Sequence, residues 1–239
     1  MSKKVLITGG SRGIGAECVR KFAAAGDKVA FIYNKSRDAA DSLASECSAL
    51  PIQADISRPD EAVRAVKIAA EALGGIDILV NNAGIAHIGL FTDLTDEDWS
   101  HICSTNLSSA IYVSREASKS MISAHYGRII NIGSVWGRAG ASCEVAYSAT
   151  KAGLRGFTLA LAKELGPSGI TVNCIEPGVI DTEMNAALGD DVRAELIDET
   201  PLCRIGTPAD VADAVFFLAS DSASFITAQT IGVDGGFGI

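Results

Sequence analysis

Tyr147 and Lys151 are the residues whose types and spacing most directly suggest acid–base chemistry. They lie four residues apart in the stretch AYSATKAG, residues 146–153. Residues at this spacing meet on one face of a helix, and a nearby ammonium group lowers the pKa of a phenol. The pair could therefore exchange a proton near neutral pH. The alternative is an aromatic residue beside a solvated charge on a surface helix.

A glycine-rich turn near the amino terminus has the composition of a phosphate-binding loop. The stretch LITGGSRGIG ends an apolar run and opens a segment of helical period, with the glycine spacing G-x-x-x-G-x-G. Glycines let a backbone approach a pyrophosphate, which the positive N-terminus of a helix attracts. A purely structural turn would contain the same glycines. We assign the following loop residues to a dinucleotide cofactor: Gly9, Ser11, Arg12, Gly13, Ile14 and Gly15.

The residues after the second apolar run indicate which dinucleotide binds. A carboxylate at this position would accept a hydrogen bond from the 2′-hydroxyl of the adenosine ribose and repel a 2′-phosphate. The sequence instead reads AFIYNKSR, which places Asn34, Lys35 and Ser36 there, and Arg12 lies in the glycine loop. Cationic and hydroxyl groups suit a phosphate dianion, so we predict NADP(H) rather than NAD(H). Alternatively, these charges are simply solvated at the start of a helix.

The elements that must position these residues alternate along the chain. Seven apolar runs, at 4–8, 28–33, 51–55, 76–82, 127–134, 169–177 and 230–236, are separated by segments of helical period at 13–26, 36–49, 59–73, 97–124 and 144–166. Continuous apolar runs are typical of strands covered on both faces. The pattern predicts one domain, residues 1–239, with a doubly wound (Rossmann) α/β fold, a seven-stranded parallel sheet and helices on both faces. An insertion at about 182–206 precedes the last helix.

Composition excludes several classes of function. The net charge is −9 over 239 residues, which disfavours a nucleic-acid or anionic-membrane surface. The six cysteines show no C-x-x-C pair and the three histidines are isolated, so we expect no metal site and a reducing compartment. No apolar run reaches the length of a membrane span or a signal peptide. We expect a cytoplasmic protein.

Several motifs in one order resemble the short-chain dehydrogenase/reductase family along the whole chain. They are TGGSRGIG at 8–15, NNAG at 81–84, the Tyr147/Lys151 pair, PGVIDT at 177–182 and VDGG at 233–236. The phrases GRIINIGSV, YSATKAGL and FLASD are most similar to 3-oxoacyl-[acyl-carrier-protein] reductases within that family. The resemblance implies a catalytic tetrad of Asn106, Ser134, Tyr147 and Lys151.

The resemblance also implies further cofactor contacts beyond the strand ends. Besides Tyr147 and Lys151, they are Asp55 and Ile56 after the third strand, Asn82, Ala83 and Gly84 after the fourth, and Pro177, Gly178, Ile180 and Thr182 after the sixth. Ligands of open α/β sheets bind at these ends, so the residues should converge on one cleft. Each also has a structural alternative: Asp55 could cap a helix, Asn82 could belong to a turn and Asn106 could kink a helix.

The resemblance implies an NADPH-dependent ketone reductase, with 3-oxoacyl thioesters as the first choice of substrate. An acidic acyl-carrier protein could deliver the substrate, and Arg128 matches one docking arginine, whereas Ser168 replaces a second basic residue. The alternatives are a dehydrogenase of a sugar, steroid or other secondary alcohol, and an NADP-sensing protein without turnover. The insertion at 182–206 matches a substrate lid, and the family's assembly implies a homotetramer. Glu176 stands where the family has a small residue.

Overall fold

The chain folds around one parallel sheet of seven strands, described by a computed structural model for residues 2–186 and 188–238. The strand order is β3-β2-β1-β4-β5-β6-β7, and every neighbouring pair is parallel. The strands are β1 (Lys4–Thr8), β2 (Lys28–Tyr33), β3 (Leu50–Gln53), β4 (Ile78–Asn81), β5 (Gly127–Ile132), β6 (Ile170–Pro177) and β7 (Thr230–Val233). The predicted doubly wound α/β fold is confirmed.

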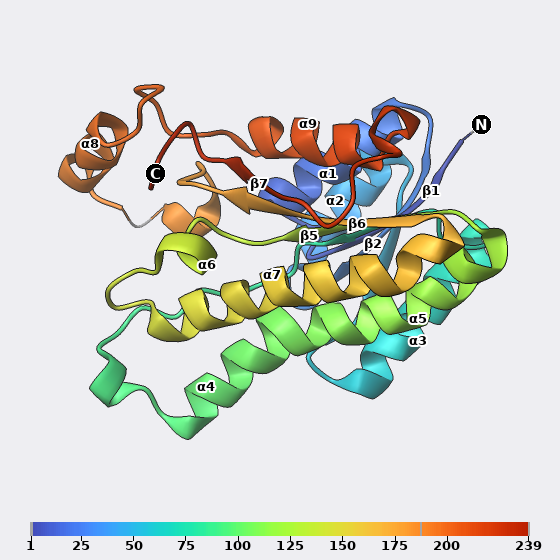
Figure 1. The fold of residues 1–239 in the computed structure, drawn as a ribbon, viewed down its shortest axis with the longest axis horizontal. Coiled ribbons are helices and arrows are strands. Elements are labelled where there is room, and N and C mark those ends of the chain that lie inside the picture. Colours follow the sequence, from blue (N-terminus) through green and yellow to red (C-terminus); the bar gives the residue numbers. More distant parts are fainter. Residues whose placement is uncertain (1, 187, 239) are drawn as a thin grey trace.

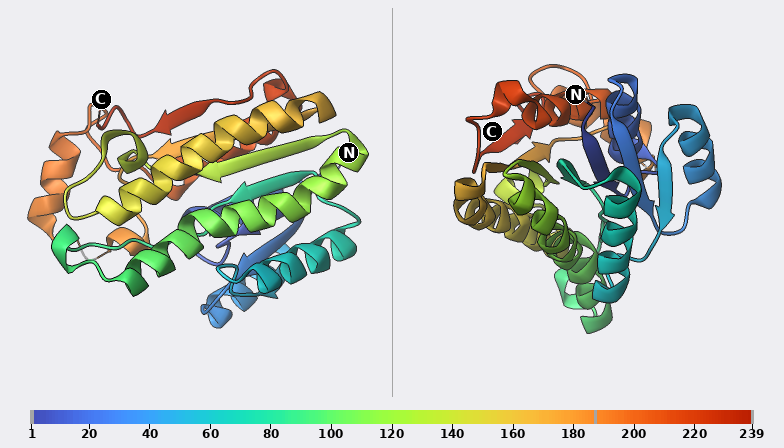
Figure 2. Two further views of the ribbon diagram at one scale, coloured as in Figure 1. Left: turned by 60° about the horizontal axis from the view of Figure 1, so that its bottom comes forward. Right: turned by 90° about the vertical axis from the view of Figure 1, so that its right-hand side faces the viewer.

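Helices cover both faces of this sheet (Figures 1 and 2). One face carries α1 (Gly13–Ala24), α2 (Arg37–Cys47) and α9 (Pro208–Ala219), and the other carries α3 (Pro59–Leu73), α5 (Ser109–Ala124) and α7 (Val145–Leu165). The shorter helices are α4 (Asp96–Cys103), α6 (Trp136–Ala139) and α8 (Asp190–Asp198). In Figure 1 the strands run from right to left, so α6 and α8 lie beyond their carboxyl ends.

The continuous apolar strands are explained by two separate cores. In β1, Val5 and Ile7 face the layer of α1 and α9, while Leu6 faces that of α3 and α5. Successive side chains of a strand point to opposite faces, so a strand buried on both faces must be apolar at every position. The two cores fix the sheet between the helix layers and leave its carboxyl edge to carry polar groups.

The helix predicted at 97–124 is interrupted in the structure. A π-helical turn, Ser104–Ser108, separates α4 from α5 and contains Asn106. The amide of Asn106 donates to the carbonyl of Ile85 (2.9 Å) and its oxygen accepts from the Ile85 N–H (2.8 Å). This pair of bonds to another segment accompanies the widened turn, and such turns are frequent at functional sites. The structural alternative for Asn106, an irregularity within the helix, is thus present as this π-helical turn.

The predicted insertion at about 182–206 leaves the sheet and returns to it at one point. Its ends pair as a short parallel bridge between Ile180 and Gly206, with Asp181 N donating to the Gly206 carbonyl at 2.8 Å. Between them lie the short helix Glu183–Asn185 and α8. The insertion is therefore anchored at its base, next to the carboxyl end of β6.

The end of β1 is joined to the end of β4 through a threonine hydroxyl. Thr8 is 1% exposed, and its Oγ1 accepts from the backbone N–H groups of Asn82 and Ala83, both at 3.0 Å. The side-chain amide of Asn82 donates in return to the carbonyls of Thr8 (3.1 Å) and Gly9 (3.0 Å). These bonds fix the glycine loop against the segment that follows β4.

We predict that Thr8→Val destabilises the fold although it preserves shape. The valine would leave two N–H groups without an acceptor, at a cost of roughly 2 to 4 kcal/mol in the free energy of unfolding. Urea unfolding followed by circular dichroism measures this loss. Thr8→Ser, which retains the hydroxyl, is the control and should cost much less. Equal losses in the two variants would contradict the hydrogen-bond explanation.

Candidate active site

The four predicted catalytic residues meet beyond the carboxyl ends of β4 and β5. A Cβ placed on Gly84 would lie 3.3 Å from Oδ1 of Asn106 and 3.5 Å from Nζ of Lys151, so both side chains border this glycine. The Ser134 hydroxyl lies close enough to the Tyr147 phenol to lower its pKa. Ser134 follows β5, whereas Tyr147 and Lys151 both lie in the first half of α7. The structure therefore brings residues from four segments to one place.

Lys151 is buried at this junction, with only 4% of the residue exposed. Its ammonium donates to the carbonyl of Ile132, the last residue of β5, at 2.8 Å. Burial lowers the pKa of Lys151 to about 8. The lysine thus connects α7 to the end of the strand that carries Ser134, and it places a positive charge inside the site.

The expected lowering of the pKa of Tyr147 is wrong for the side chains of this structure. The pKa of Tyr147 is raised to about 12, chiefly by burial and also by the negative charge of Glu144. The hydroxyl of Ser134 acts in the opposite direction. The Lys151 ammonium lies 5.5 Å from the centre of the tyrosine ring and is bonded to the Ile132 carbonyl. Burial is therefore the largest influence on the pKa of Tyr147, and the phenol stays protonated at neutral pH.

Asn106 is 1% exposed and bonds to the chain itself. Besides its two bonds to Ile85, its amide donates to Oγ1 of Thr150 at 3.3 Å. Thr150 belongs to α7, one residue before Lys151. Asn106 thereby links the loop after β4 to the helix that carries Tyr147 and Lys151, which is a positioning role.

The glycine loop is shaped by close packing as well as by its own turn. Gly9 has φ +63°, and a Cβ there would lie 2.9 Å from Cα of Ala83. A Cβ on Gly15 would lie 2.2 Å from the carbonyl oxygen of Gly9. Close packing therefore explains the presence of these two glycines, whether or not the loop binds a phosphate. The neighbouring loop residues Ser11 and Ile14 are partly exposed.

The predicted phosphate-binding residues at the end of β2 lie at the surface. Asn34, Lys35 and Arg12 are exposed, and Ser36 is partly exposed immediately before α2. By contrast, Arg37 donates to the side chain of Gln53 at 3.0 Å. The groups predicted to meet a 2′-phosphate are thus on accessible parts of two adjacent loops.

Asp55 and Ile56 follow β3 as predicted. One carboxylate oxygen of Asp55 accepts from the N–H and the hydroxyl of Ser57, at 3.1 and 2.7 Å. Ile56 is buried, 6% exposed. Asp55 therefore stabilises the turn before α3, a role similar to the helix cap that was its structural alternative. Its contact with an adenine stays a prediction.

The segment after β6 contacts both the turn that carries Ser134 and the glycine loop. The carbonyl of Pro177 accepts from the Val135 N–H at 2.9 Å. A Cβ on Gly178 would lie 2.8 Å from Cα of Asp234, so this glycine is required by packing. Ile180 is buried at the base of the insertion. Thr182 lines a pocket of about 420 Å³ together with Gly13, and the same pocket is lined by three acidic residues, Glu17, Asp181 and Glu183.

Two residues with a role in this geometry were missed from the sequence. Thr8 precedes the glycine loop and joins it to β4, and a hydroxyl at a buried strand end was the available signal. Glu144 is the N-cap of α7, three residues before Tyr147, and its charge acts on that phenol. The position of Glu144 just before Tyr147 is visible in the sequence. Its effect on the pKa of Tyr147 can be seen only in the folded structure.

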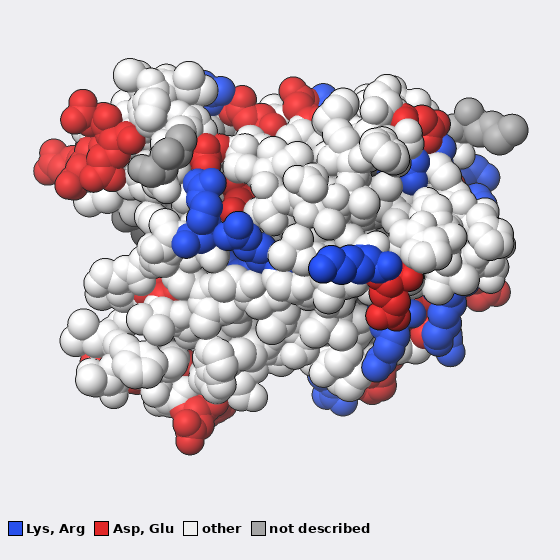
Figure 3. Space-filling model, viewed as in Figure 1, with Lys and Arg blue, Asp and Glu red and all other residues white. Residues whose placement is uncertain are grey.

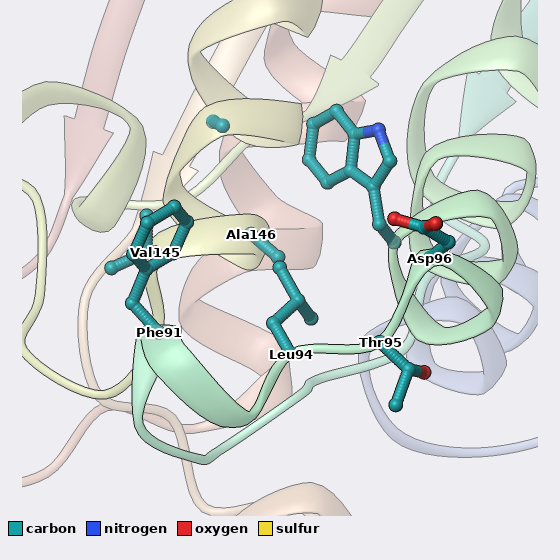
Figure 4. A pocket seen from close by; sticks show the side chains of 8 residues that line it. Phe91, Leu94, Thr95, Asp96, Val145 and Ala146 are labelled. Carbon is teal, nitrogen blue, oxygen red and sulfur yellow. The ribbon is translucent and has the colours of Figure 1, made fainter.

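A separate apolar pocket lies on the other side of α7 (Figure 4). It has a volume of about 390 Å³, and its apolar lining comes from Phe91, Leu94, Trp99, Val145, Ala146 and Ala149. Val145 and Ala149 are two positions from Tyr147 and Lys151, a rotation of about 200° around a helix. This pocket is therefore distinct from the catalytic residues.

An acidic acyl-carrier protein would need a basic docking surface, and the charges near the site differ from that expectation. Arg128, the predicted docking arginine, is 4% exposed at the amino end of β5, and its guanidinium lies 3.7 Å from Asp221 and 4.5 Å from the ring centre of Tyr126. The burial of this side chain gives the docking role no support, and that role stays a prediction. Near the carboxyl edge of the sheet, α8 carries four carboxylates and one arginine, visible as the acidic cluster at the left of Figure 3.

Two further properties of the described residues bear on function. Across residues 2–186 and 188–238, no three His, Cys, Asp or Glu side chains are grouped as a metal site would need. Over the same residues, no helix has the length and apolar character needed to cross a membrane.

Comparisons with known proteins agree with this geometry. A family model described as Enoyl-(Acyl carrier protein) reductase matches residues 9–238. The chain is 43% identical over 237 residues to the 3-oxoacyl-[acyl-carrier-protein] reductase FabG of Escherichia coli K12, covering 98% of this chain and 96% of that protein. It is 39% identical to the protein of the same description from Staphylococcus epidermidis, with 99% of each chain covered.

Solved structures give the same result. A short-chain dehydrogenase/reductase from Serratia marcescens has a TM-score of 0.93 and 37% identity, covering 99% of this chain and 98% of that one. A metagenomic blue fluorescent protein in complex with NADPH also has a TM-score of 0.93, with 40% identity and coverage of 100% and 99%. The chain belongs to the short-chain dehydrogenase/reductase family, whose members are oxidoreductases that act on CH–OH and C=O groups.

Proposed function

We propose that the protein reduces a ketone to a secondary alcohol with NADPH, and that Tyr147 donates the proton. The observation that carries this proposal is the junction at Gly84, which Asn106 and Lys151 border, beside the neighbouring hydroxyls of Ser134 and Tyr147. NADPH supplies the hydride when it is bound. The alkoxide that develops on the substrate needs hydrogen-bond donors and a proton, and these two hydroxyls can provide them.

The protonation states of the site suit this direction of reaction. A phenol with a pKa of about 12 remains protonated at neutral pH and is available as a donor. After transfer, the phenolate needs a compensating positive charge, and Lys151 provides one nearby. In this proposal Ser134 holds the substrate oxygen next to the phenol, while Lys151 stabilises the phenolate.

The residues present fit an NADP cofactor. The glycine loop before α1, in which Gly9 and Gly13 have positive φ, and the exposed side chains of Arg12 and Lys35 support this assignment. Arg12 and Lys35 would hold the 2′-phosphate by charge-assisted hydrogen bonds. The NADPH complex of the structurally similar blue fluorescent protein supports the same cofactor.

Substrates of the 3-oxoacyl thioester class are the first choice, on the basis of the similarity to the FabG proteins. Residues 182–206 would form the lid over this substrate. The acidic α8 and the buried Arg128 favour a second candidate, a reductase or dehydrogenase of a small ketone or alcohol that is not delivered by an acidic carrier protein. Like charges near an entrance slow the approach of an acidic partner.

The reaction is tested with acetoacetyl thioesters, free and carried by an acyl-carrier protein, under NADPH. We expect NADPH oxidation by the wild type and a loss of roughly 10² to 10⁴ in kcat for Tyr147→Phe, because the proton donor is removed. The variant should retain NADPH binding, measured by fluorescence. Tyr112→Phe, on α5, is the matched control. Near wild-type turnover in Tyr147→Phe would exclude this role, and turnover confined to sugars or steroids with NADP⁺ would favour the second candidate.

Cofactor preference is tested by removing the two predicted phosphate-binding charges. In Arg12→Ala and Lys35→Ala we expect KM for NADPH to rise roughly tenfold to hundredfold, since each would lose a hydrogen bond to a charged group. KM for NADH should hardly change. Lys28→Ala, at the opposite end of β2, serves as the control. Equal use of NADH and NADPH by the wild type would contradict the assignment.

We also propose a cytoplasmic homotetramer. All six cysteines are free, which suits a reducing compartment. Apolar side chains are exposed along α4, α5 and α7, including Trp99 (43%), Ile122 (42%) and Val145 (45%), and Figure 3 shows that the surface over the first half of α7 is mostly uncharged. Such faces are typical of interfaces. Light scattering at micromolar concentration should give four times the chain mass, and a monomeric mass would contradict this.

A further inference from the structure

Glu176 is a buried carboxylate that the proposed chemistry does not use. It lies on β6 with 1% of the residue exposed, and its Oε1 has no hydrogen-bond partner among the described residues. Opposite it on β7 the sheet has Gly232, which offers no side chain. A buried polar group without a partner costs free energy, so its retention at this position calls for a physical explanation.

The side chain of Glu176 packs directly beneath the turn that carries Ser134. A Cβ on Gly133 would lie 3.1 Å from Cγ of Glu176. The same turn is bonded to the backbone on either side of the glutamate, because Gly133 N donates to the Ile175 carbonyl (2.7 Å) and Val135 N to that of Pro177 (2.9 Å). Any movement of Glu176 is therefore transmitted to the residues that flank Ser134.

Two arginines from the elements around the active site offset the charge of Glu176. Arg155 of α7 lies one helical turn after Lys151, and its Nε is 3.9 Å from Oε1 of Glu176. Arg138 of α6 donates to Asp234 at 2.9 Å and also acts on the charge of Glu176. Glu176 thus attracts α7, which carries Tyr147, and α6, which follows Ser134, toward the end of β6.

We propose that Glu176 is a positioning residue that holds the Ser134 turn against α7 through Arg155, so that the Ser134 hydroxyl stays next to the phenol of Tyr147. The inference rests on the proposed ketone reduction for its effect on turnover. It requires the ionised carboxylate, because a neutral side chain would not attract Arg155.

The charged groups that face Glu176 set the pH range in which this contact exists. Burial raises the pKa of Glu176, Arg155 and Arg138 lower it, and Asp234 raises it. Cys174 on the same strand is a buried thiol whose pKa is raised to about 11, so it stays neutral, although Lys151 acts on it. Because the folded pKa of Glu176 exceeds the unfolded value, its ionisation destabilises the fold. That cost is absent below the unfolded pKa and grows as the pH rises through the folded pKa.

The destabilising effect of the ionised Glu176 distinguishes a positioning role from a purely structural one. If Glu176 served only stability, Glu176→Gln should lower Tm at pH 8. We expect the opposite: a Tm at least equal to that of the wild type, together with a loss of roughly tenfold or more in kcat, because small misplacements of catalytic groups are costly. KM for NADPH should not change. The kcat of the wild type should fall as the pH drops through the raised pKa of Glu176. The pH profile of Glu176→Gln should lack this decrease.

Coupling and control variants complete the experiment. Arg155→Met should lower kcat as Glu176→Gln does, and the double variant should be no worse than the single ones, because all three remove one contact. Arg64→Met, on α3, removes an exposed arginine that pairs with Glu61 and should leave kcat unchanged. A kcat within twofold of the wild type in Glu176→Gln, or additive losses in the double variant, would overturn the proposal.

A readout independent of turnover keeps this test separate from that of the proposed function. If the wild type reduces no ketone, the proposed function fails, and the amide resonances of residues 133–135 decide the positioning role. Both Glu176→Gln and the more distant Arg155→Met should shift the Ser134 amide in ¹H–¹⁵N spectra, while Arg64→Met should not. An unshifted Ser134 amide in Arg155→Met would overturn the proposal.

Discussion

The buried bond between the Lys151 ammonium and the Ile132 carbonyl is the interaction on which the rest of the site depends. A charge this deep is expensive unless it is paired, and here its partner is the last carbonyl of β5, at 2.8 Å. The bond fixes the first half of α7 over the strand that leads into Ser134. Because Tyr147 lies one turn earlier on the same face, the position of its phenol follows from this contact. Burial lowers the pKa of the lysine, so the site retains its charge at a cost in stability.

A second constraint is that the residues that look like ligands also hold the scaffold together. Asn82 and Asn106 use their side-chain amides on backbone groups of Gly9 and Ile85, and Thr8 accepts two N–H groups across the strands. Loops at the edge of a parallel sheet lack the ladder bonds that fix strands, so side chains must replace them. This explains why polar residues gather at the carboxyl ends even where no ligand needs them.

Charge is distributed unevenly around this edge. Helix α8 is acidic, whereas Arg12 and Lys35 are exposed on the loops after β1 and β2. Arg138 and Arg155 are pairing partners of Asp234 and Glu176. The molecule therefore combines a negative overall charge with local positive charges in the proposed cofactor region and near the turn that carries Ser134. Local charge, not the net value, decides which anions approach.

The sequence by itself determined the doubly wound fold, because seven apolar runs and their intervening helices leave few topologies for a parallel sheet. It also predicted that Tyr147, Lys151 and Ser134 belong to one site, and the structure places these three residues near one another. Only the tertiary structure decided how these groups are charged: desolvation, which depends on distant packing, raised the pKa of Tyr147 where the spacing to Lys151 alone predicted a decrease. The burial of Arg128, the π-helical turn at Asn106 and the place of Glu176 beneath Ser134 likewise depend on contacts between segments far apart in the chain.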